Sequence, residues 1–193
     1  MDWQKGTHSI NEQLAIHKLP EIHVLSAHAI SGGDSHQAYQ LHTPDKNYFL
    51  KKSPSQNLSM LNAELHNLKA LTQSQTITCP TPYATGTFEN NAWLLMEFIP
   101  LAKQGDDFQR GKNLAFMHHQ INRDPHPFGW FEENFIGQSL QRNQWTTDWI
   151  QFYGQQRLLP QFEMSQLRGA PTSLYQSGLK LIENLPFWFQ NYQ

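Results

Sequence analysis

The chain has 193 residues, enough for one domain with a sizeable core or for one lobe and part of another. Its formal net charge is -2, from 14 Lys and Arg against 16 Asp and Glu, with no Lys/Arg-rich run. This balance argues against nucleic acid and anionic membranes as main partners, because neither would meet a positive field. A small substrate of neutral or mixed charge fits better.

Targeting signals are absent from the sequence as given. The first twenty residues contain no apolar core of a signal peptide, and no stretch approaches the roughly 20 apolar residues of a membrane span. Cys79 is the one cysteine, so an intramolecular disulfide cannot form. These features indicate a cytoplasmic protein.

The first half of the chain begins with a helical pattern and continues with strand patterns. Apolar spacing predicts a helix over 2–18, which Pro20 ends. Stretches rich in β-branched and apolar residues predict strands at 22–30, 36–42 and 47–52. Turn-forming residues separate these strands, with Gly32 and Gly33 between the first two.

A second helix and two more strands follow. Leucine and methionine side chains recur at helical spacing over 59–71, which predicts an amphipathic helix with Ser59 as its N-cap. Glu64 lies within this helix. Strands are predicted at 83–88 and 92–99, and the apolar middle of the second is typical of a strand buried on both faces.

Beyond residue 100 the pattern becomes helical. Helices are predicted over 111–120, 146–167 and 172–191, with a loop at 122–144. Asp106 and Asp107 are interpreted as carboxylates at the start of a helix or in a loop. The sequence therefore predicts an α+β protein with a domain over 1–100 that contains the sheet and a helical domain over 101–193.

Three features of the first domain together predict a phosphate-binding site. The turn at Gly32 and Gly33 would let backbone amides approach phosphate oxygens, and Lys51 on the third strand would supply a positive charge. Glu64 on the following helix would hold that lysine. A Gly-Gly pair alone is more often an ordinary hairpin turn. The order of all three features on the expected elements favours phosphate binding.

The strand at 92–99 leads into a candidate hinge. Backbone groups of Glu97, Phe98 and Ile99 could take the edge of an adenine ring there. In protein kinases, a lysine on the third strand pairs with a glutamate of the next helix, and Lys51 and Glu64 match that order. The glycine segment reads SGGDSHQAY, which departs from the GxGxxG signature of eukaryotic protein kinases.

Successive sequence blocks resemble the fructosamine kinase family. The blocks are FLK at 49–51, AE at 63–64, LLMEF at 94–98, GKNLAFMH at 111–118, FGW at 128–130, NFIG at 134–137, Trp145, DW at 148–149, FY at 152–153 and RLLPQ at 157–161. The resemblance covers nearly the whole chain. Its most specific part is the series rich in tryptophan and phenylalanine over 128–161.

This resemblance implies a protein-kinase-like fold, in which a five-stranded antiparallel sheet with a helix C is followed by a partial helical lobe. It implies a nucleotide-binding first lobe, a second lobe on the substrate side, and ATP with Mg²⁺ as cofactors. The reaction would phosphorylate a sugar hydroxyl of a fructosamine- or ribulosamine-type ketoamine. The partners would be ATP and a glycated amine or protein-bound ketoamine.

The resemblance also implies roles for individual residues. Lys51 would contact the phosphates and Glu64 would orient it, while Gly32 and Gly33 would cover the phosphates. The segment from Glu97 to Ile99, which includes Phe98, would form the adenine hinge.

The sequence as given lacks two motifs of that family. Family members carry an HGDLWSGN-like catalytic loop and a later Asp-Pro segment, and neither string is present in the 193 residues. We therefore expect no catalytic residue and no Mg²⁺ ligand from this chain, and no turnover by it alone. The ten histidines include no HxxxH or HExxH pair, so no other metal site is predicted.

Two alternatives to the front part of an active kinase stay open. One is a naturally shortened pseudokinase that binds nucleotide or a partner without chemistry. The other is a truncation by a frameshift or by an incomplete gene model. The exact ketoamine, the hydroxyl, the oligomeric state and the nucleotide affinity also stay open.

Overall fold

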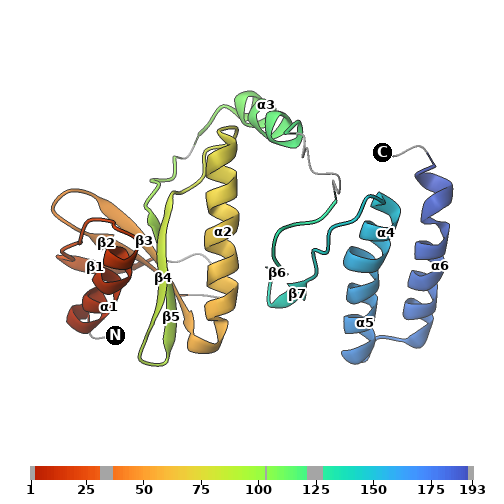
Figure 1. Ribbon diagram of the computed structural model, residues 1–193, viewed down its shortest axis with the longest axis horizontal. Helices are drawn as coiled ribbons and strands as arrows, with labels where there is room; N and C mark the ends of the chain where they lie inside the picture. Colours follow the sequence, from red (N-terminus) through yellow and green to blue (C-terminus); the bar gives the residue numbers. More distant parts are fainter. Residues whose placement is uncertain (1–2, 31–36, 103, 121–127, 191–193) are drawn as a thin grey trace. The chain divides into compact units, whose positions relative to one another are not determined.

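The computed structural model describes residues 3–30, 37–102, 104–120 and 128–190 (Figure 1). They fall into two compact units, Met1–Ile121 and Asn122–Gln193. The first unit continues past residue 100, where the sequence predicted a boundary, because it includes one more helix after the sheet. The assignment of the two predicted domains to nucleotide and substrate binding stays a prediction.

The first unit is built on a five-stranded antiparallel sheet, as the sequence predicted. Its elements are α1 (Trp3–Ile16), β1 (Ser26–Ile30), β2 (Gln37–His42), β3 (Asn47–Pro54), α2 (Leu58–Ser74), β4 (Pro82–Phe88), β5 (Asn91–Glu97) and α3 (Asp107–His118). The strand order is β1-β2-β3-β5-β4, and every neighbouring pair is antiparallel. β5 therefore lies inside the sheet, next to β3.

The two faces of this sheet are covered by different helices, which lie on opposite sides of it in Figure 1. α1 buries Ile10 and Leu14 against one face, together with Trp93 of β5. α2 buries Leu61 against the other face, together with Leu94 of β5. Alternate side chains of β5 thus enter two different cores, which confirms the prediction of a strand buried on both faces.

Gly86 of β4 is required by the packing of Trp93. The Trp93 indole is fully buried and lies across the Gly86 backbone. A Cβ at position 86 would stand 2.5 Å from Cζ2 of Trp93, closer than atoms in van der Waals contact. Glycine therefore allows the large indole to fill the core under α1.

α2 begins differently from the sequence prediction. A 3-10 turn over Ser55–Asn57 precedes it, and Asn57 rather than Ser59 occupies the N-cap position. The predicted Ser59 cap was therefore wrong. Asn57 makes no capping bond with its side chain. Its side-chain amide nitrogen donates to the Ser53 hydroxyl at the end of β3.

α3 begins four residues before its predicted start. Asp106 accepts a hydrogen bond from the Gln109 amide at 2.9 Å, and its neighbour Asp107 pairs with Arg110. The Asp106 contact satisfies a helix-start amide, and both carboxylates place negative charge at the N-terminal end of the helix. These contacts confirm the interpretation of both aspartates as helix-start carboxylates.

The second unit contains a hairpin that the sequence did not predict. Its elements are β6 (Asn134–Ile136), β7 (Ser139–Gln141), α4 (Trp149–Tyr153), a π-helical turn (Gly154–Leu158), α5 (Leu159–Leu167) and α6 (Thr172–Trp188). The short antiparallel pair β6–β7 lies in the stretch predicted as a loop. Gly137 connects its strands with a φ of +60°, which favours glycine.

The π-helical turn has a local cause at Pro160. In a regular α-helix the Pro160 nitrogen would donate to the carbonyl of Gln156, but proline has no N–H. The helix widens before it, so that the Leu159 amide donates to the Gly154 carbonyl. Arg157 then donates to the Gln156 carbonyl at 3.0 Å and to the Arg142 carbonyl at 2.6 Å.

The predicted helix at 146–167 is thus two α-helices joined by a π-helical turn, and the last helix ends near its predicted end.

Within the described residues, no helix has the length and apolar character needed to cross a membrane.

Candidate functional site

The candidate site lies on the face of the sheet that α2 covers. Tyr48 and Leu50 of β3 belong to the core under α1. Side chains alternate along a strand, so Phe49 and Lys51 belong to the opposite face. Phe49 packs against the core under α2, as this alternation requires.

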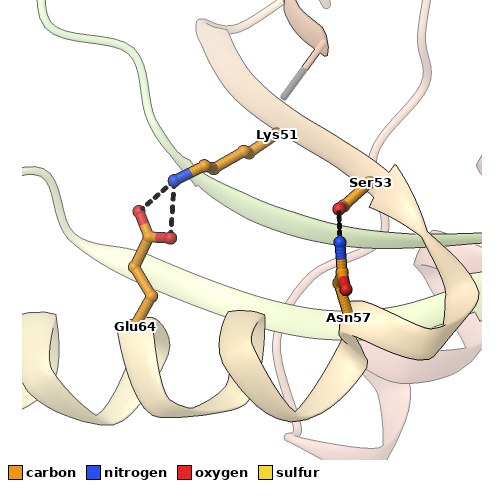
Figure 2. Close-up of polar contacts among 4 residues, drawn as sticks. All are labelled: Lys51, Ser53, Asn57 and Glu64. Carbon is orange, nitrogen blue, oxygen red and sulfur yellow. Dashed lines mark hydrogen bonds and ion pairs between the residues drawn. The ribbon is translucent and has the colours of Figure 1, made fainter. Parts of the chain in front are cut away.

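Lys51 and Glu64 meet between β3 and α2 (Figure 2). The Lys51 Nζ donates to Oε1 of Glu64 at 2.9 Å and to Oε2 at 2.7 Å. The two side chains keep 23% and 31% of their exposure, so solvent screens the pair and its contribution to stability is modest. Its main consequence is geometric: one ammonium group is held at a fixed place beside the sheet.

An apolar row continues from Lys51 across the neighbouring strands. Lys51 pairs in register with Ala38 of β2, and Ala38 pairs with Ile30 of β1. Both side chains are half-buried. α2 makes its main contacts with β4 and β5, so this row lies beside the helix rather than under it. A flat ligand could pack here next to the ammonium.

Gly32 and Gly33 belong to the segment 31–36 that connects β1 to β2, and they lie outside the described residues. Their predicted part in covering phosphates stays a prediction. The row of Lys51, Ala38 and Ile30 is next to the ends of the strands that this segment joins.

Glu97 ends β5 and is held by Thr81 on the chain before β4. The Glu97 amide donates to the Thr81 carbonyl at 2.8 Å, and Oε2 of Glu97 accepts from the amide and the hydroxyl of Thr81 at 3.1 Å and 2.9 Å. Phe98 and Ile99 follow the last ladder residue, half-buried and 36% exposed respectively. Sequence reasoning did not identify Thr81, because no motif marks it.

A lysine with two tyrosines lies on the other face, at the turn between β2 and β3. Lys46 donates to the Tyr83 hydroxyl at 3.0 Å and lies over the rings of Tyr48 and Tyr83, at 5.0 Å and 4.9 Å from their centroids. The hydrogen bond to Tyr83 raises the pKa of Lys46 above its usual value. Burial raises the pKa of Tyr48. The sequence marked only a turn here.

Among the residues that the structure describes, no three His, Cys, Asp or Glu side chains lie close enough together to hold a metal ion.

The sheet with α1 and α2 on its two faces defines a class of protein. The chain matches the crystal structure of a protein assigned as a fructosamine-3-kinase from Haemophilus somnus 129PT, with a TM-score of 0.79 and 21% identity. The match covers 95% of this chain and 63% of that one. A counterpart from Thermobifida fusca YX-ER1 gives 0.74 and 19%, over 97% and 63%. At such identities the likeness shows the fold, which is protein-kinase-like, as predicted.

Sequence comparisons identify the family within that class. The family described as fructosamine kinase matches residues 6–193. The protein named protein-ribulosamine 3-kinase, chloroplastic, of Oryza sativa subsp. japonica is 34% identical over 159 residues, which are 81% of this chain and 46% of that protein. Its Arabidopsis thaliana namesake is 31% identical over 84% of this chain and 50% of its own length. The chain belongs to the fructosamine kinase family.

The chain spans about half the length of the curated relatives that it matches. The family membership confirms the resemblance of the sequence blocks described above.

Proposed function

We propose that this chain supplies the nucleotide-binding part of an ATP-dependent kinase that phosphorylates a sugar hydroxyl of a ketoamine. The observation that carries the proposal is the ion pair of Lys51 and Glu64 between the third strand and the following helix. Kinases use this arrangement to hold the α- and β-phosphates of ATP. The names of the relatives, ribulosamine kinase and ketoamine kinase, supply the substrate class.

The Lys51 ammonium has three N–H donors, and Glu64 takes two of them. The third is available for a phosphate oxygen. Because Glu64 fixes the ammonium in advance, ATP does not bear the entropy cost of ordering a long lysine side chain. Backbone amides of Gly32 and Gly33 would contact the same phosphates, as glycine turns allow.

The adenine and ribose would pack along the apolar row of Ile30 and Ala38 beside Lys51. The base edge would then meet the hinge at Glu97, Phe98 and Ile99. The Glu97 amide already donates to the Thr81 carbonyl. The backbone amide that donates to the adenine edge would therefore be that of Phe98 or Ile99.

ATP binding by the 193-residue chain tests this proposal, with Lys51→Met as the main variant. Methionine keeps the apolar stem of lysine but removes the charge, so we expect affinity to fall at least about tenfold, as for loss of a charge-assisted hydrogen bond. Lys52→Met is the matched control, because Lys52 is adjacent but belongs to the opposite face of β3. Isothermal titration calorimetry measures both. Equal affinities for the two variants would refute the assignment of Lys51.

Several finer features stay predictions. The sequence contains no HGDLWSGN-like string, so no reaction step is assigned to residues of this chain. Binding of nucleotide without turnover, the alternative of a pseudokinase, would use the same Lys51 and Glu64. The cytoplasmic location is also a prediction, and the plant relatives carry chloroplastic names.

A further inference from the structure

The link between β3 and α2 is short. β3 ends at Pro54, one 3-10 turn covers Ser55–Asn57, and α2 begins at Leu58. The Ser55 amide donates to the Asn90 carbonyl at 3.0 Å, which fixes this turn to the connection between β4 and β5. The orientation of α2 on the sheet is therefore set within a few residues, because no longer loop lies between the strand and the helix.

One hydrogen bond joins the end of this turn to β3. The Asn57 side-chain amide donates to the Ser53 hydroxyl at 2.7 Å (Figure 2). Ser53 is only 3% exposed, so water cannot easily replace its partner. Asparagine at an N-cap usually accepts from a helix amide, but Asn57 makes no such bond. Its side chain connects the helix to the strand instead.

This contact bridges the same two elements as the candidate site. Lys51 and Ser53 lie two residues apart on β3 and therefore share a face. Asn57 and Glu64 are seven residues apart, about two helical turns, and so lie on the same side of α2. Figure 2 shows the two contacts side by side between strand and helix.

The ion pair depends closely on the rotation of α2. A side-chain tip lies about 5–6 Å from a helix axis, so a rotation of about 10° moves it by about 1 Å. The Lys51–Glu64 bonds measure 2.7 and 2.9 Å, and a shift of that size would break at least one of them. A second contact restrains α2 on β4, where the Thr85 hydroxyl donates to Asn62 Oδ1 at 2.6 Å.

We propose that Ser53 and Asn57 are positioning residues for Lys51, which fix the first turn of α2 on β3 and so hold Glu64 against the ammonium before nucleotide binds. The inference rests on the proposed function for its ligand, ATP. It assigns no contact with ATP to either residue.

The test uses the 193-residue chain and titrates ATP into variants of this pair. Asn57→Ala should weaken binding by about three- to tenfold, the effect of one lost hydrogen bond. Asn57→Asp should restore it, because a carboxylate can accept from the Ser53 hydroxyl. Ser53→Ala, which adds no volume, is the second variant if Asn57→Ala does not fold. Ser74→Ala is the control, since it removes the bonds of Ser74 to Leu71 and Thr76 at the far end of α2.

A purely structural role would lower the melting temperature without acting through Lys51. In a Lys51→Met background, Asn57→Ala should therefore cause no further loss of affinity. A further loss there, or an affinity equal to that of Ser74→Ala in the unaltered background, would overturn the inference.

The reactivity of the Lys51 amine separates this inference from the proposed function. If the unaltered chain does not bind ATP, the proposed function fails. Reductive methylation, read site by site by mass spectrometry, then decides the inference alone: Asn57→Ala should speed the reaction of Lys51 several-fold by loosening its partner. Unchanged reactivity would overturn it.

Discussion

Glu64 holds the Lys51 ammonium in place between β3 and α2. Glu64 takes two of its donors at 2.9 and 2.7 Å, and both side chains remain partly exposed. Solvent screening keeps the pair a small part of the stability. A phosphate would meet a prepositioned positive charge beside an apolar row, with Ala38 and Ile30 next to it.

The Lys46 and Tyr48 pair predicts a loss of stability at alkaline pH. Both pKa values are raised in the folded protein, so the folded state holds these protons more tightly than the unfolded chain. Their contribution is complete below the unfolded values of about 10 and is lost as the pH rises through the folded values. Urea unfolding between pH 8 and 11 should show this decline.

Tyr83→Phe provides the matched variant for that decline. It removes the hydrogen bond that is the main cause of the raised Lys46 pKa, so its alkaline decline should be shallower. Parallel pH profiles for the two proteins would contradict the assigned cause.

Single residues differ in how well the sequence predicts them. The pairing of Lys51 with Glu64 could be predicted, because their order on a strand and the next helix is specific and the family blocks surround them. Ser53, Asn57 and Thr81 could not, because neutral hydrogen bonds between common residues leave no pattern in a sequence. Gly32 and Gly33 remain predictions.

Among the elements, the sheet and its helices were predictable because their apolar spacing is long and regular. β5 was recognisable as buried on both faces from its continuous apolar run. The pair β6 and β7 was missed because three-residue strands are too short for an alternating pattern to show. The π-helical turn before Pro160 was missed because a single wider turn is too short to produce a periodic signal of its own.

Packing around β5 predicts a sharp difference between two glycines. Gly86→Ala should lower the free energy of unfolding by about 1–3 kcal/mol, because its Cβ would meet the buried Trp93. Gly111→Ala is the control: Gly111 lies in α3 with no atom near its missing Cβ, and alanine favours a helix by up to about 1 kcal/mol. Chemical denaturation of both variants measures the contrast. Equal effects of both substitutions would be inconsistent with the close packing of Trp93 on β4.

For the whole molecule, family and fold are established while the reaction is proposed. The chain spans about half of its curated relatives and contains no HGDLWSGN-like string. We therefore expect the 193-residue chain to bind ATP but to form no ADP when a ketoamine is added, since no base or metal carboxylates are assigned to it. A coupled ADP assay checks this, and sustained ADP formation that depends on the ketoamine would contradict it.

The most direct measurement is affinity labelling with an acyl phosphate of ATP, which transfers its acyl group to a lysine beside the phosphates. Mass spectrometry should find Lys51 labelled, and excess ATP should protect it. Labelling of Lys52 or Lys46 in its place, or labelling of Lys51 that ATP does not reduce, would contradict the claim that Lys51 holds the nucleotide.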